Sequence, residues 1–188
     1  MLNINFNPFP IINTERLLLR QVDKTDVNEI FFLRSDEIIM KYLDKAPAKN
    51  LDDAYKFIQL ISDNEKNNID ITWAIALKGN PKLLGTICFW NIQKEHYRAE
   101  IGYVLHPEHW GRGLMQEAIT AVLKYGFNIM NLHSVEAQVN PNNTSSIKLL
   151  EKNGFIREAY FKENYFYDGK FLDTAVYSLL TSEHKKGH

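Results

Sequence analysis

Two long segments of the chain carry apolar residues at helical spacing. Between residues 113 and 130 these positions recur every three or four residues, at Leu114, Ala118, Ala121, Val122, Tyr125 and Ile129. After Asn50, a common type of helix cap, the same spacing recurs at Leu51, Ala54, Phe57, Ile58 and Ile61. The spacing puts each set on one face and predicts two amphipathic helices. Two shorter helices are expected from Asp23 or Thr25 to about Arg34, and over 143–153 before Gly154.

Short apolar and β-branched segments separate these helices. They predict strands over residues 16–22, 71–77, 83–90, 97–105, 134–139, 155–161 and 173–180. Turn signals stand between neighbouring strands, at Lys78-Gly79-Asn80-Pro81 and at Asp168-Gly169. The order of elements predicts a mixed α/β domain, in which antiparallel hairpins come first and a βαβ-like crossover follows.

Length and composition are those of one domain of ordinary size. The chain has 188 residues, of which 45% are hydrophobic and 24% charged, with a formal net charge of −1. One domain is expected over 1–188, with an extended arm at 1–12 and a frayed tail at 181–188. The charge balance gives no general attraction to nucleic acids or anionic membranes, so neither is expected as a partner.

The sequence predicts a cytoplasmic location. No apolar run approaches transmembrane length, and residues 1–10 lack the pattern of a signal peptide. The only cysteine, Cys88, lies in an apolar run and is interpreted as a buried, inert thiol. The histidines of the tail are not interpreted as ligands, and no metal is expected.

A glycine turn between a strand and a helix is the first candidate site. The strand over 97–105 is followed by Gly111-Arg112-Gly113, and the helix begins at once. The free N–H groups and the positive dipole end of a helix favour an anion, and glycines let the backbone approach a phosphate. The turn therefore predicts a phosphate-bearing ligand, although such turns often only cap a helix. A dinucleotide fingerprint is excluded because Gln116 stands where its third glycine belongs, and a Walker loop is also absent.

The residues around this turn resemble the GNAT N-acetyltransferase superfamily, in its RimJ/RimL-like branch. Glu108 to Gly113 resembles the acetyl-CoA-binding motif, with Glu108 in place of the usual Gln or Arg. Further matches cover about residues 13–180, in the right order. They are Thr14-Glu15-Arg16-Leu17-Leu18-Leu19-Arg20, Asn143-Thr144-Ser145-Ser146, Leu150-Glu151-Lys152-Asn153-Gly154-Phe155, and Asp168-Gly169-Lys170 to Asp173 and Tyr177.

The resemblance implies a fold and a co-substrate. The GNAT fold is a single central mixed, mostly antiparallel sheet of about six to seven strands, flanked by about four helices. The co-substrate is acetyl-CoA, held chiefly by backbone groups. The residues expected to bind it are Leu105, His106, Gly111, Arg112, Gly113, Leu114, Asn143 and Ser146.

Two residues are candidates for the chemistry of acetyl transfer. Glu100 alternates with apolar neighbours on a central strand, where an unpaired carboxylate is costly, and the resemblance implies a base for the amine there. The alternative is a structural ion pair with Arg98 or Lys94, and Glu136 is a weaker rival. Ser146 is implied near the thioester sulfur as a proton donor, or it is an ordinary serine of a first helical turn.

Other hydroxyl groups are assigned no chemistry. Many GNAT enzymes carry a tyrosine where this chain has Leu150, so a tyrosine acid is not available at that position. Tyr103 and Tyr167 are interpreted as packing residues. Asn143 is expected either to cap a helix or to contact the pantetheine arm as well.

The acceptor amine is expected to be a peptide or protein α-amine, as in the RimJ/RimL-like branch. An α-amine has a pKa of about 7.7 against about 10.4 for lysine, so it asks less of a base. The alternatives are a small amine, such as a polyamine, amino sugar or antibiotic, and a non-catalytic acyl-CoA-binding module. The acceptor groove is expected near residues 31–41 and at Tyr165-Phe166-Tyr167, with Asp36, Glu37 and Asp44 favouring a small amine. A monomer or a homodimer is expected.

Overall fold

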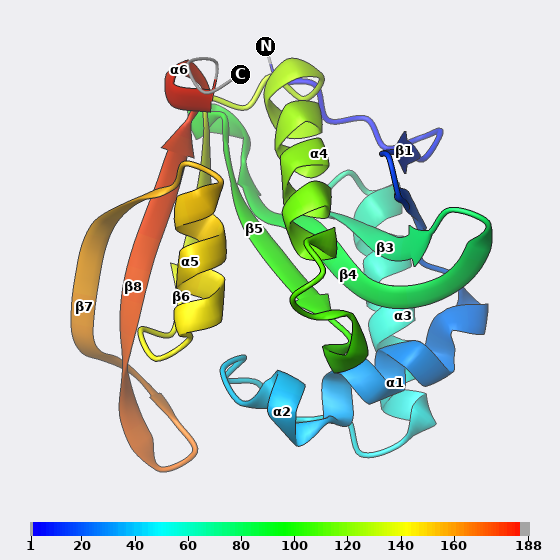
Figure 1. Cartoon of the computed structure of the whole chain (residues 1–188), viewed down its shortest axis with the longest axis horizontal. Coiled ribbons are helices and arrows are strands. Elements are labelled where there is room, and N and C mark those ends of the chain that lie inside the picture. Colours follow the sequence, from blue (N-terminus) through cyan, green and yellow to red (C-terminus); the bar gives the residue numbers. More distant parts are fainter. Residues whose placement is uncertain (1, 185–188) are drawn as a thin grey trace.

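One eight-stranded sheet organises the computed structural model, which describes residues 2–184 (Figure 1). The strand order is β1-β2-β3-β4-β5-β6-β8-β7, and β5–β6 is the parallel pair. The strands are β1 (Ile12–Asn13), β2 (Leu17–Gln21), β3 (Ile71–Leu77), β4 (Asn80–Gln93), β5 (Arg98–Leu105), β6 (Ser134–Val139), β7 (Ile156–Tyr167) and β8 (Lys170–Leu180).

Helices cover both faces of the sheet. They are α1 (Val27–Ser35), α2 (Glu37–Met40), α3 (Leu51–Lys66), α4 (Leu114–Asn128), α5 (Thr144–Lys152) and α6 (Thr181–His184), with 3-10 turns η1 (Lys24–Asp26), η2 (Lys94–His96) and η3 (Pro107–His109). One apolar core lies between the sheet and helices α4 and α5, and a second lies under α1 and α3. Figure 1 shows α4 and α5 in front of the sheet and α3 behind it.

The expected fold class is confirmed, and the expected strand count is wrong. The sheet has eight strands rather than six to seven, because Ile12, the last residue of the expected arm, and Asn13 form a further strand that pairs with β2. The four expected helices correspond to α1, α3, α4 and α5, and the described residues add the short α2 and α6. β7 continues to Tyr167, beyond the expected end at residue 161. Most of its side chains are exposed, so its sequence lacks the alternation of apolar and polar residues from which the end of a strand is predicted.

Both ends of the described chain contact the rest of the molecule. In the arm, Phe6 is only 2% exposed, and its N–H donates to Asn68 Oδ1 at 2.9 Å. The indole N–H of Trp73 donates to the carbonyl of Pro10 at 2.7 Å. Thr181–His184, expected to be frayed, form α6, and residues 185–188 of the expected tail lie outside the described residues.

The parallel strands β5 and β6 separate halfway along their length. Three pairs join them, ending at Glu100 and Glu136, while β5 continues to Leu105 and β6 to Val139. Beyond the last pair, no strand formed by residues 2–184 lies along the edge of β5 that faces β6. The separation therefore opens the sheet between the carboxyl ends of two central strands, beside the N-terminal ends of α4 and α5 (Figure 1).

Candidate active site

Glu100 lies where β5 and β6 separate. Its neighbours Ala99 and Ile101 belong to the core under α4, whereas Val104 packs against the core under α1 and α3. Because strand side chains alternate, Glu100 is directed to the α1/α3 face. It is 5% exposed, and within the described residues its Oε2 has no hydrogen-bond partner. The carboxyl is thus buried and only partly satisfied.

Burial raises the pKa of Glu100 to about 7, from an ordinary value of 4.5. Hydrogen bonds from the Asn91 side chain and from the Gln138 backbone oppose this shift, as do the charges of Lys45 and Arg98. Close to neutral pH the group therefore exists both as a carboxylate and as an acid, which is the property that a general base needs.

The structure bears on both alternatives to Glu100 as the base, namely an ion pair that includes Glu100 and a catalytic role for Glu136 instead. Arg98 forms an ion pair with Glu136, and within residues 2–184 no ion pair includes Glu100. Glu136 also accepts a hydrogen bond from Gln138 at 3.2 Å. The rival carboxylate is therefore the one that is neutralised by an ion pair, whereas Lys45 and Arg98 act on Glu100 only from a greater distance.

A pair of hydroxyl groups lies on the opposite face of β5. The oxygens of Tyr103 and Ser146 are 2.8 Å apart, and burial raises the pKa of Tyr103 to about 12, although the bond to Ser146 lowers it. Asn143 caps α5 by accepting a hydrogen bond from the Ser146 N–H at 3.1 Å. The sequence interpretation of Tyr103 as a packing residue missed this pair. No spacing rule connects two residues that are 43 positions apart.

The glycine turn presents helix N–H groups to solvent. Gly111 and Gly113 have φ values of 70° and 75°, in the left-handed region that glycine adopts without strain. Gly113 stands at the N-cap position of α4 with no side-chain cap, and residues 111–113 are exposed whereas Leu114 is buried. The first N–H groups of α4 are thus available to an anion.

Two backbone groups of Leu105 and His106, which were expected to bind the cofactor, already form hydrogen bonds within the chain. The His106 N–H donates to Leu84 at 2.7 Å, and the Leu105 carbonyl accepts from the Trp110 indole at 2.7 Å. The His106 ring stacks on Phe32, with centroids 4.4 Å apart. These contacts stabilise the turn after β5. The exposed backbone near this site is that of residues 111–113 in the glycine turn.

Two segments expected to line the acceptor groove lie close together at the loop that follows α2. Tyr165, from the β7–β8 hairpin, donates a hydrogen bond to Asp44, which follows the expected segment 31–41. Lys45 Nζ lies 5.3 Å from the centroid of the Trp90 ring, and Trp90 is the register partner of Glu100. Asp36 is engaged as the N-cap of α2. The hairpin and the loop thus meet over the β4–β5 region that carries Glu100.

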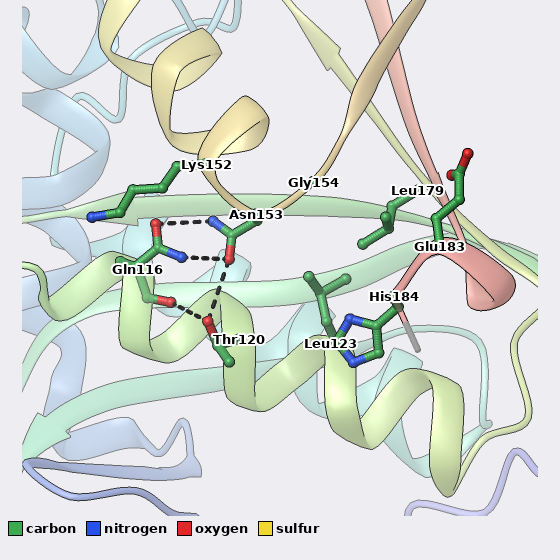
Figure 2. A pocket seen from close by; sticks show the side chains of 9 residues that line it. All are labelled: Gln116, Thr120, Leu123, Lys152, Asn153, Gly154, Leu179, Glu183 and His184. Atoms are coloured by element: carbon green, nitrogen blue, oxygen red, sulfur yellow. Dashed lines mark hydrogen bonds between the residues drawn. The ribbon is translucent and has the colours of Figure 1, made fainter. Parts of the chain in front are cut away.

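A cavity of about 290 Å³ lies between α4, α5 and the end of β8 (Figure 2). Gln116 and Asn153 exchange two hydrogen bonds across it, at 2.7 and 3.2 Å, and Thr120 also donates to Asn153 at 3.3 Å. None of the expected site residues lines this cavity. Gln116, which excluded the dinucleotide fingerprint, therefore joins α4 to the end of α5.

Two further features concern metals and membranes. Within residues 2–184, no group of three or more His, Cys, Asp or Glu side chains is arranged to hold a metal ion. In the same part of the chain, the helices are too short or too polar to cross a membrane.

Comparison with sequences places the chain among acetyltransferases. A family model described as an acetyltransferase (GNAT) domain matches residues 16–156. The chain is 35% identical to the uncharacterized N-acetyltransferase YoaA of Bacillus subtilis (strain 168), over 92% of this chain and 97% of that protein. It is 31% identical to the ribosomal protein uS5-alanine N-acetyltransferase of Escherichia coli (strain K12), over 56% of this chain and 55% of that enzyme.

Comparison with solved structures agrees. A GNAT-family acetyltransferase from Bacillus anthracis superposes with a TM-score of 0.82 and 32% identity, over 93% of this chain and 100% of that chain. The spermidine N-acetyltransferase of Vibrio cholerae, in complex with CoA and spermine, superposes with a TM-score of 0.81 and 26% identity, over 92% of this chain and 99% of that chain. The chain therefore belongs to the GNAT family and is an acetyl-CoA-dependent N-acetyltransferase.

Proposed function

We propose that the enzyme acetylates the α-amine of a peptide or protein, by direct attack of the amine on acetyl-CoA in a ternary complex. The observation that carries this proposal is Glu100, a buried carboxyl at the point where β5 and β6 separate, which forms no ion pair with the other residues that the structure describes. In the proposed mechanism Glu100 accepts the proton of the attacking amine, directly or through a water molecule.

The cofactor is proposed to lie on the α4/α5 face. Its pyrophosphate would meet the backbone of Gly111, Arg112, Gly113 and Leu114, because the free N–H groups of the helix point there. Leu105 and His106 end the strand along which the pantetheine arm would run, and Asn143 stands at the start of α5. The acetyl group would then reach the amine through the opening between β5 and β6.

Ser146 is proposed to protonate the departing thiolate. Its hydroxyl is bonded to the Tyr103 hydroxyl, and with a pKa raised to about 12 Tyr103 keeps its proton at neutral pH. A proton given by Ser146 to the sulfur is replaced from Tyr103, Tyr103 regains its own proton from solvent, and Glu100 releases the proton of the amine to solvent. The products of the step are an N-acetyl amide and CoA with its free thiol.

The pKa of Glu100 favours an α-amine over a more basic amine. A base with a pKa of about 7 lies within about one unit of an α-ammonium group but more than three units below a lysine-type ammonium group. Similarity to the uS5-alanine enzyme, a protein α-amine acetyltransferase by its name, also supports the RimJ/RimL-like assignment.

A polyamine is the second candidate acceptor. It is favoured by the fit of nearly the whole chain to the spermidine enzyme, and by Asp44 and Glu37 near the loop that closes the acceptor side. The enzyme would use the same base and the same cofactor face for either acceptor. Both reactions need acetyl-CoA, and we propose that they take place in the cytoplasm.

Release of free thiol from acetyl-CoA tests the proposal. The acceptors are peptides with free N-termini, the same peptides with blocked N-termini, spermidine and spermine. Turnover with free but not blocked peptides is expected, whereas turnover with polyamines alone would favour the second candidate. Binding of CoA without turnover of any acceptor would contradict both and favour a non-catalytic acyl-CoA-binding module.

A further inference from the structure

Arg16 connects the start of β2 to the glycine turn before α4. Its Nε donates to Glu117 Oε2 at 2.6 Å, and its Nη1 donates to the carbonyl of Arg112 at 2.9 Å. Its backbone N–H donates to Glu117 Oε1 at 2.8 Å, and the Thr14 hydroxyl donates to the same oxygen. One guanidinium therefore holds both the first turn of the helix and the turn in front of it.

The bond to Arg112 fixes the direction of the next N–H group. In a planar trans peptide the C=O and the following N–H point in opposite directions. Since the Arg112 carbonyl is directed at Arg16, the Gly113 N–H is directed away from Arg16. Gly111 and Gly113 are otherwise free to adopt many backbone conformations. Arg16 thus holds the peptide between Arg112 and Gly113 in one orientation, next to two flexible glycines.

Arg16 also neutralises a carboxylate beside the anion site. Glu117 lies in the first turn of α4. Its negative charge there interacts favourably with the positive end of the helix dipole, but it repels a phosphate. Burial acts to raise the pKa of Glu117, yet the bonds from Thr14 and Arg16 hold it below its ordinary value, so the group stays ionised. The positive charge of Arg16 offsets the negative charge of Glu117 at this position.

We infer that Arg16 is a positioning residue for the phosphates of acetyl-CoA. It acts through the Arg112 carbonyl and through Glu117, and it sets the affinity for the cofactor rather than the rate of acetyl transfer. This inference rests on the proposed function, which assigns the turn over 111–113 to the pyrophosphate.

The variant Arg16→Lys tests the inference, with Arg20→Lys as its matched control. A lysine carries one nitrogen and cannot bond Glu117 and Arg112 together in the fork geometry of a guanidinium. Arg20 stands on the same strand and holds a buried ion pair with Asp26, but it does not contact the turn. CoA binding is measured by calorimetry, thermal unfolding by circular dichroism, and kcat and KM by thiol release.

For Arg16→Lys we expect about tenfold weaker CoA binding, because charge-assisted hydrogen bonds are lost. The KM for acetyl-CoA rises by a similar factor, while kcat and the acceptor KM stay within about twofold of the wild type. Arg20→Lys lowers the unfolding temperature and leaves CoA binding unchanged.

Two results would overturn the inference. One is an unchanged affinity for CoA in Arg16→Lys, when the wild type itself binds CoA. The other is a loss of CoA binding in Arg20→Lys as large as in Arg16→Lys, since the effect would then follow general stability. A wild type that binds no CoA would instead overturn the cofactor assignment of the proposed function.

Discussion

Glu100 and Glu136 are neighbours in the last pair of the β5–β6 ladder, and both are buried. Arg98 neutralises Glu136, whereas one carboxyl oxygen of Glu100 has no hydrogen-bond partner in the described part of the chain. Burial of a carboxylate is costly in both places, but only one of the two receives an ionic bond that offsets the cost. The two carboxylates are buried to a similar extent, so the ion pair with Arg98 is what separates the structural carboxylate, Glu136, from Glu100, which can exchange a proton.

Glu100→Gln and Glu136→Gln should separate most widely in turnover. If Glu100 is the general base, Glu100→Gln lowers kcat by about 100-fold or more, the usual contribution of such a group. Glu136→Gln should keep kcat within about threefold. Steady-state thiol release with saturating acetyl-CoA measures both. Equal losses in the two variants would remove the catalytic distinction between the carboxylates.

In stability the order of the two variants should reverse, with Glu136→Gln the more strongly affected. Glu136→Gln leaves Arg98, which is about two-fifths exposed, without its ionic partner and should lower the free energy of unfolding by about 1 kcal/mol. Glu100→Gln removes a buried charge and should leave that free energy unchanged or raise it at pH 8. Urea unfolding followed by fluorescence measures the two values.

The dependence of stability on pH has a definite sign for Glu100. Its pKa is about 7 in the folded chain against 4.5 in the reference state, so the folded state binds the proton more tightly. The wild type should therefore lose stability relative to Glu100→Gln as pH rises from 4.5 to 7. In the same range kcat/KM of the wild type should rise. Parallel stability curves for the two proteins would contradict the pKa shift.

Lys45→Met should give the smallest effect. The positive charge of Lys45 lowers the pKa of Glu100, so its removal should move the rise in kcat/KM to higher pH, by less than about one unit. Lys56→Met is the control, because Lys56 is an exposed residue of α3 that pairs with Asp53 and is not among the groups that act on Glu100. An unchanged profile in Lys45→Met would mean that solvent screens this charge fully.

The sequence was sufficient to predict the elements whose apolar residues recur at a regular spacing. Helices α3 and α4 follow from apolar spacing, and the turn before α4 follows from its two glycines. The exposed strand β7 and the two-residue strand β1 carry too little pattern to be bounded. The burial of Glu100 was expected from alternation along its strand, whereas its lack of an ionic partner depends on which carboxylate Arg98 reaches.

Contacts between distant segments are the other part that the sequence did not yield. Tyr103 with Ser146, Tyr165 with Asp44, and Arg16 with Glu117 each join segments that no local rule connects. Motif similarity marked the opening segment that contains Arg16 without giving it a role. Only the fold brings that strand to the start of α4.

The arrangement of the last two strands has a practical consequence for shortened forms of the protein. Residues 16–156 match the family model, yet β8 lies outside this range and is inserted between β6 and β7. A fragment cut at those limits would leave β6 as a bare edge and would lack Phe6, which fills the core from the opposite end of the chain. The stretch that similarity delimits is thus smaller than the unit that folds, and expression clones should span the full set of strands.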